Sequence, residues 1–221
     1  MLVISAITSQ VTSSVSYWST MLELSAVKRM LEDHLQEGLL LVAGSGLSIA
    51  EGIPSMWHLA EHLKSVIPEK LKALPDAGWE DVVTALNAGD HLEAAMGRAT
   101  LKGPTVDAIV AETAALIAAK EKIAVGRVLS GERHLPFTAF VAHIFKAGKR
   151  FNLITPNYDR LIELATEVAG IGVDSRFSGY LYGKADQKRS ADAHRESYTS
   201  GRNTLLRPLP CLSIFKPHGS L

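Results

Sequence analysis

The stretch LLLVAGSGLSIAEGIPSMW, residues 39–57, decides the fold class. It begins with an apolar run, residues 39–43, and then breaks into small residues and a proline. A short run that is apolar throughout is typical of a strand buried on both faces, as in parallel sheets flanked by helices. Glycines directly after such a strand let the backbone approach a diphosphate closely. The stretch therefore predicts a buried strand followed by a phosphate-binding loop, with an ordinary tight turn as the alternative.

Two later apolar runs repeat this arrangement. RFNLIT, residues 150–155, precedes a helical pattern in residues 156–170, and CLSIF, residues 211–215, precedes KPHGSL. Helical patterns separated by Pro and Gly fill the chain from 56 to about 147. The sequence therefore predicts an α/β fold, a Rossmann-like and mostly parallel sheet flanked by helices, with a helical insertion module at about 56–147. We expect the three strands to adjoin.

Composition separates two further segments from this domain, which we expect to span residues 21–221. Residues 1–20 show no helical or strand period, lack the basic start of a signal peptide and are not apolar enough to span a bilayer. We expect them to be a disordered tail. Residues 174–208 are rich in Gly, Ser and charge and are long for a connection inside a compact domain. We expect a flexible insertion there.

The overall composition is that of a folded chain without a marked charge. Of 221 residues, 47% are hydrophobic, which is enough to bury a core. Lys plus Arg equals Asp plus Glu at 23 each, so no positive field recruits a polyanion, and we expect neither nucleic acid nor membrane as a partner. Cys211 is the single cysteine, which excludes an internal disulfide and fits a reducing compartment. We expect a cytoplasmic protein.

Three segments in the same order resemble the sirtuin (SIR2) superfamily. GSGLSIAEGIPSMWHL is similar to its Gly-x-Gly loop followed by Ser and Gly-Ile-Pro, and ITPNYDRLIELA is similar to its Thr-x-Asn-x-Asp segment. KPHGSL is similar to its Lys-x-His-Gly-Ser segment. Each follows a predicted strand, and three collinear motifs are far more specific than one. The resemblance covers about residues 38–221.

Details within these motifs favour one branch of the superfamily. Ser55-Met56-Trp57 stands where deacetylating sirtuins carry Asp-Phe-Arg, and a long link separates Asn157 from His218. Both features resemble the SIR2-like domains of bacterial antiphage proteins. The resemblance implies an NAD+ hydrolase that cleaves the nicotinamide–ribose bond of NAD, its substrate, in antiviral defence. We also expect a homo-oligomer or a partner defence protein.

The site that this resemblance implies draws on all three segments. Asn157 would orient the attacking water or the ribose hydroxyls, His218 would be the general base, and Asp159 would tie down the loop or touch the nicotinamide amide. The residues expected to contact the dinucleotide are Ala43, Gly44, Ser45, Gly46, Ser48, Gly52, Ile53, Pro54, Thr155 and Tyr158. The three catalytic assignments have structural alternatives: Asn157 shapes a turn, Asp159 caps the helix that starts near Arg160, or His218 lies on the surface.

We expect no metal site. His58 and His62 lie four positions apart on one helical face, a spacing that can bind zinc. The sequence offers neither a Glu next to the first histidine nor an evident third ligand.

Two departures from the superfamily leave other functions open. Pro156 replaces a Gln or Thr beside Asn157 and removes a backbone donor there. Sirtuin-type folds also continue beyond the His-Gly-Ser segment, so we expect a site that is incomplete in these 221 residues. The alternatives are an NAD-dependent protein deacylase and a non-catalytic nucleotide-binding fragment.

Overall fold

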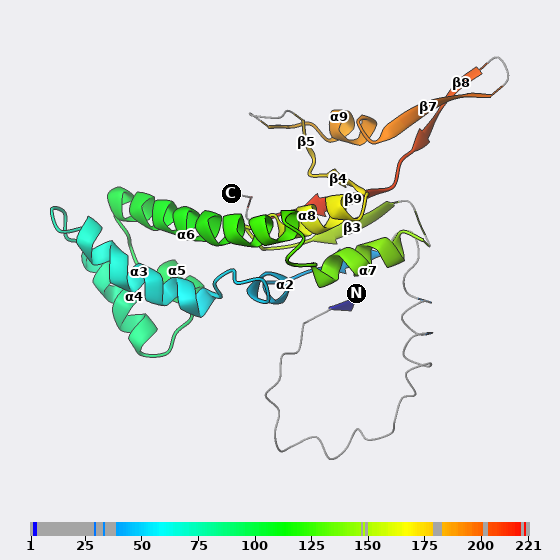
Figure 1. Cartoon of the computed structure of the whole chain (residues 1–221). Coiled ribbons are helices and arrows are strands. Elements are labelled where there is room, and N and C mark those ends of the chain that lie inside the picture. The colour runs from blue at the N-terminus through cyan, green and yellow to red at the C-terminus, as the bar shows by residue number, and fades with distance from the viewer. Residues whose placement is uncertain are drawn as a thin grey trace. The chain divides into compact units, whose positions relative to one another are not determined.

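The chain divides into two compact units (Figure 1). The first comprises residues 1–47 and 133–220, and the second residues 48–132 with residue 221. The predicted catalytic His218 lies outside the described residues, as does all of the predicted tail 1–20 except Leu2 and Val3. The computed structural model describes residues 2–3, 29, 33, 39–146, 148, 150–178, 183–200, 203–217 and 219.

A parallel sheet forms the centre of the first unit. Its four main strands lie in the order β2 (Leu40–Val42), β3 (Arg150–Ile154), β9 (Cys211–Phe215) and β4 (Gly172–Asp174), and every neighbouring pair is parallel. A two-residue strand, β1 (Leu2–Val3), pairs in parallel with β2. The predicted α/β class with a Rossmann-like parallel sheet is therefore confirmed, and the three predicted strands adjoin. β4 has three residues and begins with a glycine, so no apolar run in the sequence indicates it.

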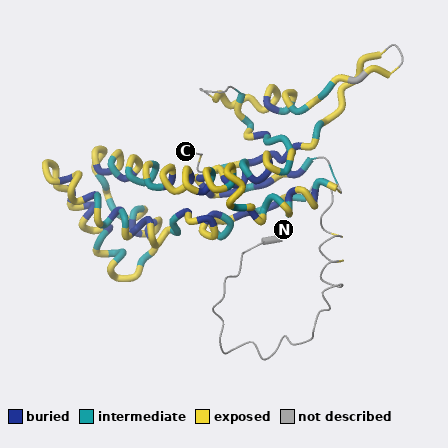
Figure 2. Tube along the Cα trace, viewed as in Figure 1, coloured by how far each residue is buried: buried dark blue, intermediate teal, exposed yellow. Residues whose placement is uncertain are grey.

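One face of this sheet carries the apolar core of the unit. Leu41 lies opposite Leu153, which lies opposite Ile214, so these side chains share a face with Phe151 and Leu212. All five are buried, and β9 is buried over most of its length (Figure 2). Helices α7 (Pro136–Ile144) and α8 (Leu161–Val168) supply further core residues, among them Ile144 and Ile162. The helices thus cover the face that the strand alternation makes apolar.

The direction of the crossovers explains which face each connection covers. The chain steps from β2 to β3 and then over β9 to β4 in one direction along the sheet, and right-handed crossovers place α7 and α8 on the same face. From β4 the chain steps back to β9, so the same rule assigns that connection to the opposite face.

The described part of this connection, predicted as an insertion at 174–208, contains regular structure. Its elements are β5 (Phe177–Ser178), β6 (Lys184–Ala185), α9 (Gln187–Asp192), β7 (Arg195–Ser200) and β8 (Asn203–Pro208). The predicted flexibility of the segment stays a prediction.

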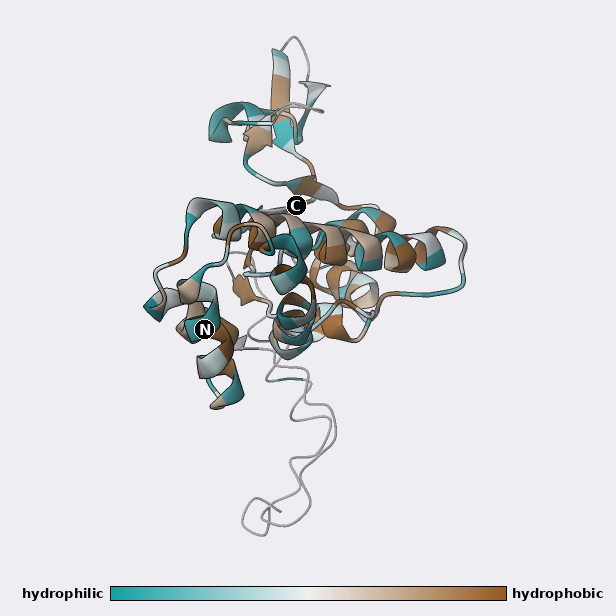
Figure 3. Cartoon of the chain, turned by 90° about the vertical axis from the view of Figure 1, so that its left-hand side faces the viewer, coloured by the Kyte–Doolittle hydropathy of each residue, from teal (hydrophilic) through white to brown (hydrophobic). Residues whose placement is uncertain are grey.

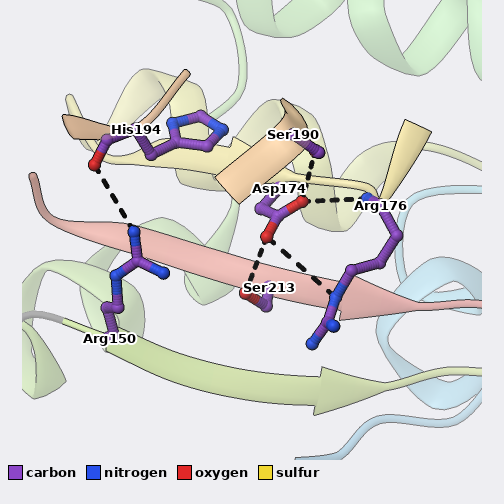
Figure 4. Close-up of polar contacts among 6 residues, drawn as sticks. All are labelled: Arg150, Asp174, Arg176, Ser190, His194 and Ser213. Atoms are coloured by element: carbon purple, nitrogen blue, oxygen red, sulfur yellow. Dashed lines mark hydrogen bonds and ion pairs between the residues drawn. The ribbon is translucent and has the colours of Figure 1, made fainter. Parts of the chain in front are cut away.

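Asp174, at the end of β4, attaches the connection to the sheet (Figure 4). Its Oδ1 accepts hydrogen bonds from Ser190 Oγ on α9 at 2.5 Å and from the Arg176 backbone N–H at 2.9 Å. Its Oδ2 accepts from Ser213 Oγ on β9 at 3.2 Å. Burial alone would raise the pKa of Asp174, but these hydrogen bonds and the charge of Arg176 outweigh it and hold the pKa below its usual value.

Cys211, the single cysteine, lies on the same face of the sheet as Asp174 and Ser213. Cys211 is only 1% exposed, and burial together with the charge of Asp174 raises the pKa of its thiol to about 11. Nearby, Arg150 Nη2 donates to the backbone oxygen of His194 at 3.4 Å, which gives the connection a second attachment to β3 (Figure 4).

The second unit is helical. It contains the second half of α2 (Gly46–Ile49) and all of α3 (Met56–Lys70), α4 (Ala77–Asn87), α5 (Leu92–Arg98) and α6 (Gly103–Leu129), and the predicted helices are confirmed. Apolar and polar segments alternate along these helices (Figure 3). Helix α3 continues past Pro68, so this proline does not end the helix. No helix in the described part of the chain is long and apolar enough to cross a bilayer. The core of the unit includes Leu59, Leu63, Ile67, Trp79, Val82, Leu92, Ala95 and Ile109.

Asp76 joins the beginnings of two helices in this unit. Its Oδ1 caps α4 by accepting from the Gly78 N–H, and its Oδ2 accepts from the Lys102 N–H and from Thr105 Oγ1 at the start of α6. One carboxylate therefore holds the beginnings of two helices together. The hydrogen bond from Thr105 is the leading cause that lowers the pKa of Asp76.

We predict that Asp174→Asn flattens the acid side of the stability profile. Because the pKa of Asp174 is lower in the folded chain, its contribution is fully present above the unfolded value of about 3.9 and is lost as the pH falls through the folded value. The variant lacks this titration, so its free energy of unfolding should be lower at neutral pH and fall less on acidification. Urea unfolding at a series of pH values measures both.

Asp192→Asn is the matched control. This carboxylate of α9 is exposed, and among the described residues it pairs only with the exposed Arg195. It should keep the acid dependence of the wild type. Equal acid slopes for the wild type and Asp174→Asn would contradict the role given to Asp174.

Candidate functional site

Three loops meet at the carboxyl edge of the sheet because β2, β3 and β9 are adjacent and parallel. The ladder continues one residue past the strand ends. The Ala43 N–H donates to the Ile154 oxygen at 3.0 Å, and the Thr155 N–H donates to the Phe215 oxygen at 3.0 Å. The loops after β2, β3 and β9 therefore start side by side, at the edge where α/β sheets bind ligands.

A side-chain hydrogen bond joins the first two loops. Asn157 Nδ2 donates to the backbone oxygen of Gly44 at 3.1 Å. The Asn157 backbone N–H donates to Oγ1 of the fully buried Thr155, also at 3.1 Å. Asn157 is itself only 7% exposed. The structure therefore brings together Gly44, Thr155 and Asn157, which the sequence assigned to one site.

The fold itself does not require a glycine at position 44. Gly44 is exposed, its φ is not positive, and a Cβ atom built there meets no atom within 4 Å. Its neighbour Ser45 is exposed, and Gly46 begins α2. This helix has only four residues, so its dipole is small.

Four other predicted contact residues belong to the second unit. Ser48 is buried, and its backbone oxygen accepts hydrogen bonds from the N–H groups of Glu51 and Ile53. Gly52 has a φ of +91°, a conformation that favours glycine, and Ile53 is buried beside the half-buried Pro54. These residues form the turn between α2 and α3.

Asp159 caps a helix. Its carboxylate is buried, and Oδ1 accepts a hydrogen bond from the Leu161 N–H, the first residue of α8, at 3.1 Å. This contact supports the capping alternative for Asp159. Tyr158, between Asn157 and Asp159, is partly exposed.

The sequence analysis did not assign a role to Lys216, which follows β9 in the KPHGSL segment. Its side chain is 8% exposed, and Nζ forms an ion pair with Glu163 Oε1 on α8 at 2.7 Å. Nζ also donates to the backbone oxygen of Asp159. Lys216 therefore links the loop after β9 to the loop that carries Asn157. The signal available in the sequence was its position at the start of the third segment, KPHGSL.

An apolar cavity of about 190 Å³ lies at the end of β2, within the first unit. Ligand pockets commonly measure about 300–1,000 Å³, so this cavity can hold only part of a dinucleotide. It is lined by Leu41, Val42, Ala43, Leu47, Pro136, Phe137, Phe140 and Leu153.

The two histidines weighed as zinc ligands have other partners. His58 Nδ1 lies 2.8 Å from Ser55 Oγ, and His62 Nε2 lies 3.8 Å from Glu112 Oε2. Among the described residues no group of three or more His, Cys, Asp or Glu is placed to hold a metal ion.

Comparison with known proteins adds no family to this description. Neither a scan against models of protein families nor a search of curated proteins gives a match to the chain. The fold and the arrangement at the sheet edge define an α/β protein with a Rossmann-like parallel sheet.

We predict that Lys216→Ala destabilises the first unit by about 2–4 kcal/mol, because it leaves the largely buried carboxylate of Glu163 without its cation. Lys216→Arg retains the charge and should lose less. Lys72→Ala removes one partner of an exposed ion pair with Glu69 and should have little effect. Urea unfolding measures the three differences, and a loss under about 0.5 kcal/mol in Lys216→Ala would contradict the link.

Proposed function

We propose that this chain is an NAD+ hydrolase of the SIR2-like type, acting in the cytoplasm in antiviral defence. The observation that carries the proposal is the hydrogen bond from Asn157 Nδ2 to the Gly44 oxygen. It joins the glycine loop and the Asn loop, which the resemblance assigns to the diphosphate and to the ribose of one substrate. Two loops that bind parts of one dinucleotide must lie this close together.

The open space at Gly44 supports a close approach of the diphosphate. Glycine loses more conformational entropy on folding than any other residue, so a glycine without a structural need indicates another constraint. At Gly44 neither the backbone angle nor a neighbouring atom supplies that need. A ligand that lies against the exposed backbone at this position would supply it.

The reaction consumes NAD+ and water and yields nicotinamide, ADP-ribose and a proton. The bond between the ribose and the nicotinamide nitrogen breaks, and its electron pair leaves with nicotinamide. The ribose passes through an oxocarbenium-like state, which a water molecule attacks. In this proposal the Asn157 amide orients that water or the ribose hydroxyls, and the imidazole of His218 accepts the proton.

A second candidate is a nucleotide-binding module that does not turn over its ligand. Hydrogen bonds within the protein favour this candidate, because Asn157 donates to Gly44 and Asp159 caps α8. Both contacts order the loop without a substrate. Binding and turnover must therefore be measured separately.

We predict that Gly44→Ala weakens NAD+ binding at least about tenfold without lowering the melting temperature. The methyl group meets no protein atom, so the fold tolerates it, but it occupies the space through which the diphosphate approaches. Gly97→Ala in α5 is the control, since a Cβ there also meets nothing, and it should leave binding unchanged. Calorimetric titration with NAD+ gives the affinities. Equal affinity of Gly44→Ala and wild type would place the diphosphate elsewhere.

For turnover, we predict that Asn157→Ala and His218→Ala each reduce nicotinamide release at least about 100-fold. Asn152→Ala, an exposed asparagine on β3, is the control and should retain full activity. Asp159→Ser keeps a capping oxygen and should retain most activity if Asp159 acts only through the helix. Wild-type binding of NAD+ without nicotinamide release would favour the binding module, and absence of both would refute the proposal.

A further inference from the structure

The hairpin of β7 and β8 has an unpaired outer edge. The two strands pair antiparallel from Arg195–Pro208 to Ser200–Asn203, and among the strands that the structure describes they form a separate two-stranded sheet (Figure 1). An isolated two-stranded hairpin is marginally stable in water at best. Its outer edge presents backbone N–H and C=O groups that can pair with another strand.

β8 is exposed along its whole length. All six of its residues are exposed, including the consecutive Leu205 and Leu206 at 43% and 63%. Successive residues of a strand point to opposite faces, so each face of the hairpin exposes one leucine. Exposed apolar side chains beside an unpaired edge favour association through that edge.

We infer that the outer edge of β8 pairs antiparallel with β8 of a second copy of this chain, which forms a four-stranded sheet around a twofold axis. A twofold axis perpendicular to the sheet keeps each side chain on its face, so a residue lies opposite a residue of the same face. The register centred on Leu205 sets Leu205 opposite itself, Asn203 opposite Arg207 and Thr204 opposite Leu206.

The charges of the hairpin and the proline of β8 favour pairing with a second copy in this register. Arg207 forms an ion pair with Glu196 of its own hairpin, so the edge carries no unbalanced charge that would select an acidic or basic partner. In the register centred on Leu205 no like charges lie opposite each other. A register centred on Leu206 would bring Pro208, which lacks an N–H, into the ladder opposite Thr204. The register centred on Leu205 is therefore favoured over the one centred on Leu206.

The strength expected of this contact is modest. Pairing over one short strand buries less area than the roughly 1,600 Å² of a standard stable interface, so the dimer should depend on protein concentration. The inference is independent of the NAD+ chemistry, because the hairpin contains none of the residues assigned to that reaction.

A disulfide scan tests the register. Residues directly opposite each other have Cα atoms about 4.5–5.5 Å apart, within reach of a disulfide, so Leu205→Cys should form a linked dimer under mild oxidation. Asn203→Cys is the matched control on the same strand. In the proposed register its two copies lie four residues apart, about 13 Å along the strand, and should remain unlinked. Cys211 is buried with a raised pKa, so the wild type should not link.

Size measurement by light scattering tests the interface itself. The wild type should show a concentration-dependent dimer, and Leu205→Lys should shift it to monomer with an unchanged melting temperature, because two lysines would meet at the axis. A wild type that stays monomeric at the highest concentration refutes the inference. So does a dimer that Leu205→Lys leaves intact, or equal linking of Leu205→Cys and Asn203→Cys. Each of these results is separate from any assay of NAD+.

Discussion

Parallel pairing of β2, β3 and β9 is the constraint on which the arrangement at the sheet edge depends. Parallel neighbours end at the same edge of the sheet. The loop after β3 therefore starts beside the loop after β2 and beside the loop after β9. Only then can Asn157 donate to Gly44, a residue 113 positions away, and Lys216 reach the Asp159 oxygen. Each contact fixes one loop against the next. The loops are therefore ordered by protein contacts before any ligand is present.

Because the crossovers are right-handed, one face of the sheet carries the apolar core and the other carries buried polar contacts. Helices α7 and α8 bury Phe151 and Leu212 on one face. The return from β4 to β9 brings Ser190 onto the other face, where Ser190 Oγ donates to Asp174. Asp174 also accepts a hydrogen bond from Ser213 Oγ on β9. A buried carboxylate without such donors would be costly, so the connection and Asp174 depend on each other. The exposed hairpin then extends from an attachment that is itself well ordered by hydrogen bonds.

The sequence predicts the parts of this fold that local pattern specifies. Continuous apolar runs indicate three strands, and helical periodicity with Pro and Gly boundaries indicates the helices of the second unit. The meeting of Gly44 with Asn157 follows once the first two predicted strands are taken as parallel neighbours. By contrast, β4 has too few residues to show a pattern, and its separation from β3 by β9 is a property of pairing alone. The ion pair of Lys216 with Glu163 depends on loop geometry, which no local pattern specifies.

β9 shows why the place of β4 and the contacts of Lys216 cannot be predicted from local sequence pattern. It is the last described strand in sequence, yet it lies between β3 and β4, so the sheet is continuous only when it inserts. Leu212 and Ile214 complete the apolar core, Ser213 completes the hydrogen bonds of Asp174, and Lys216 just beyond holds the Asn157 loop. The strand and the lysine after it thus complete the core, the hydrogen bonds of Asp174 and the loop contact in a single long-range pairing step. Because such pairing requires closing long loops before contacts repay the entropy, the core and the loops should form together and late in folding.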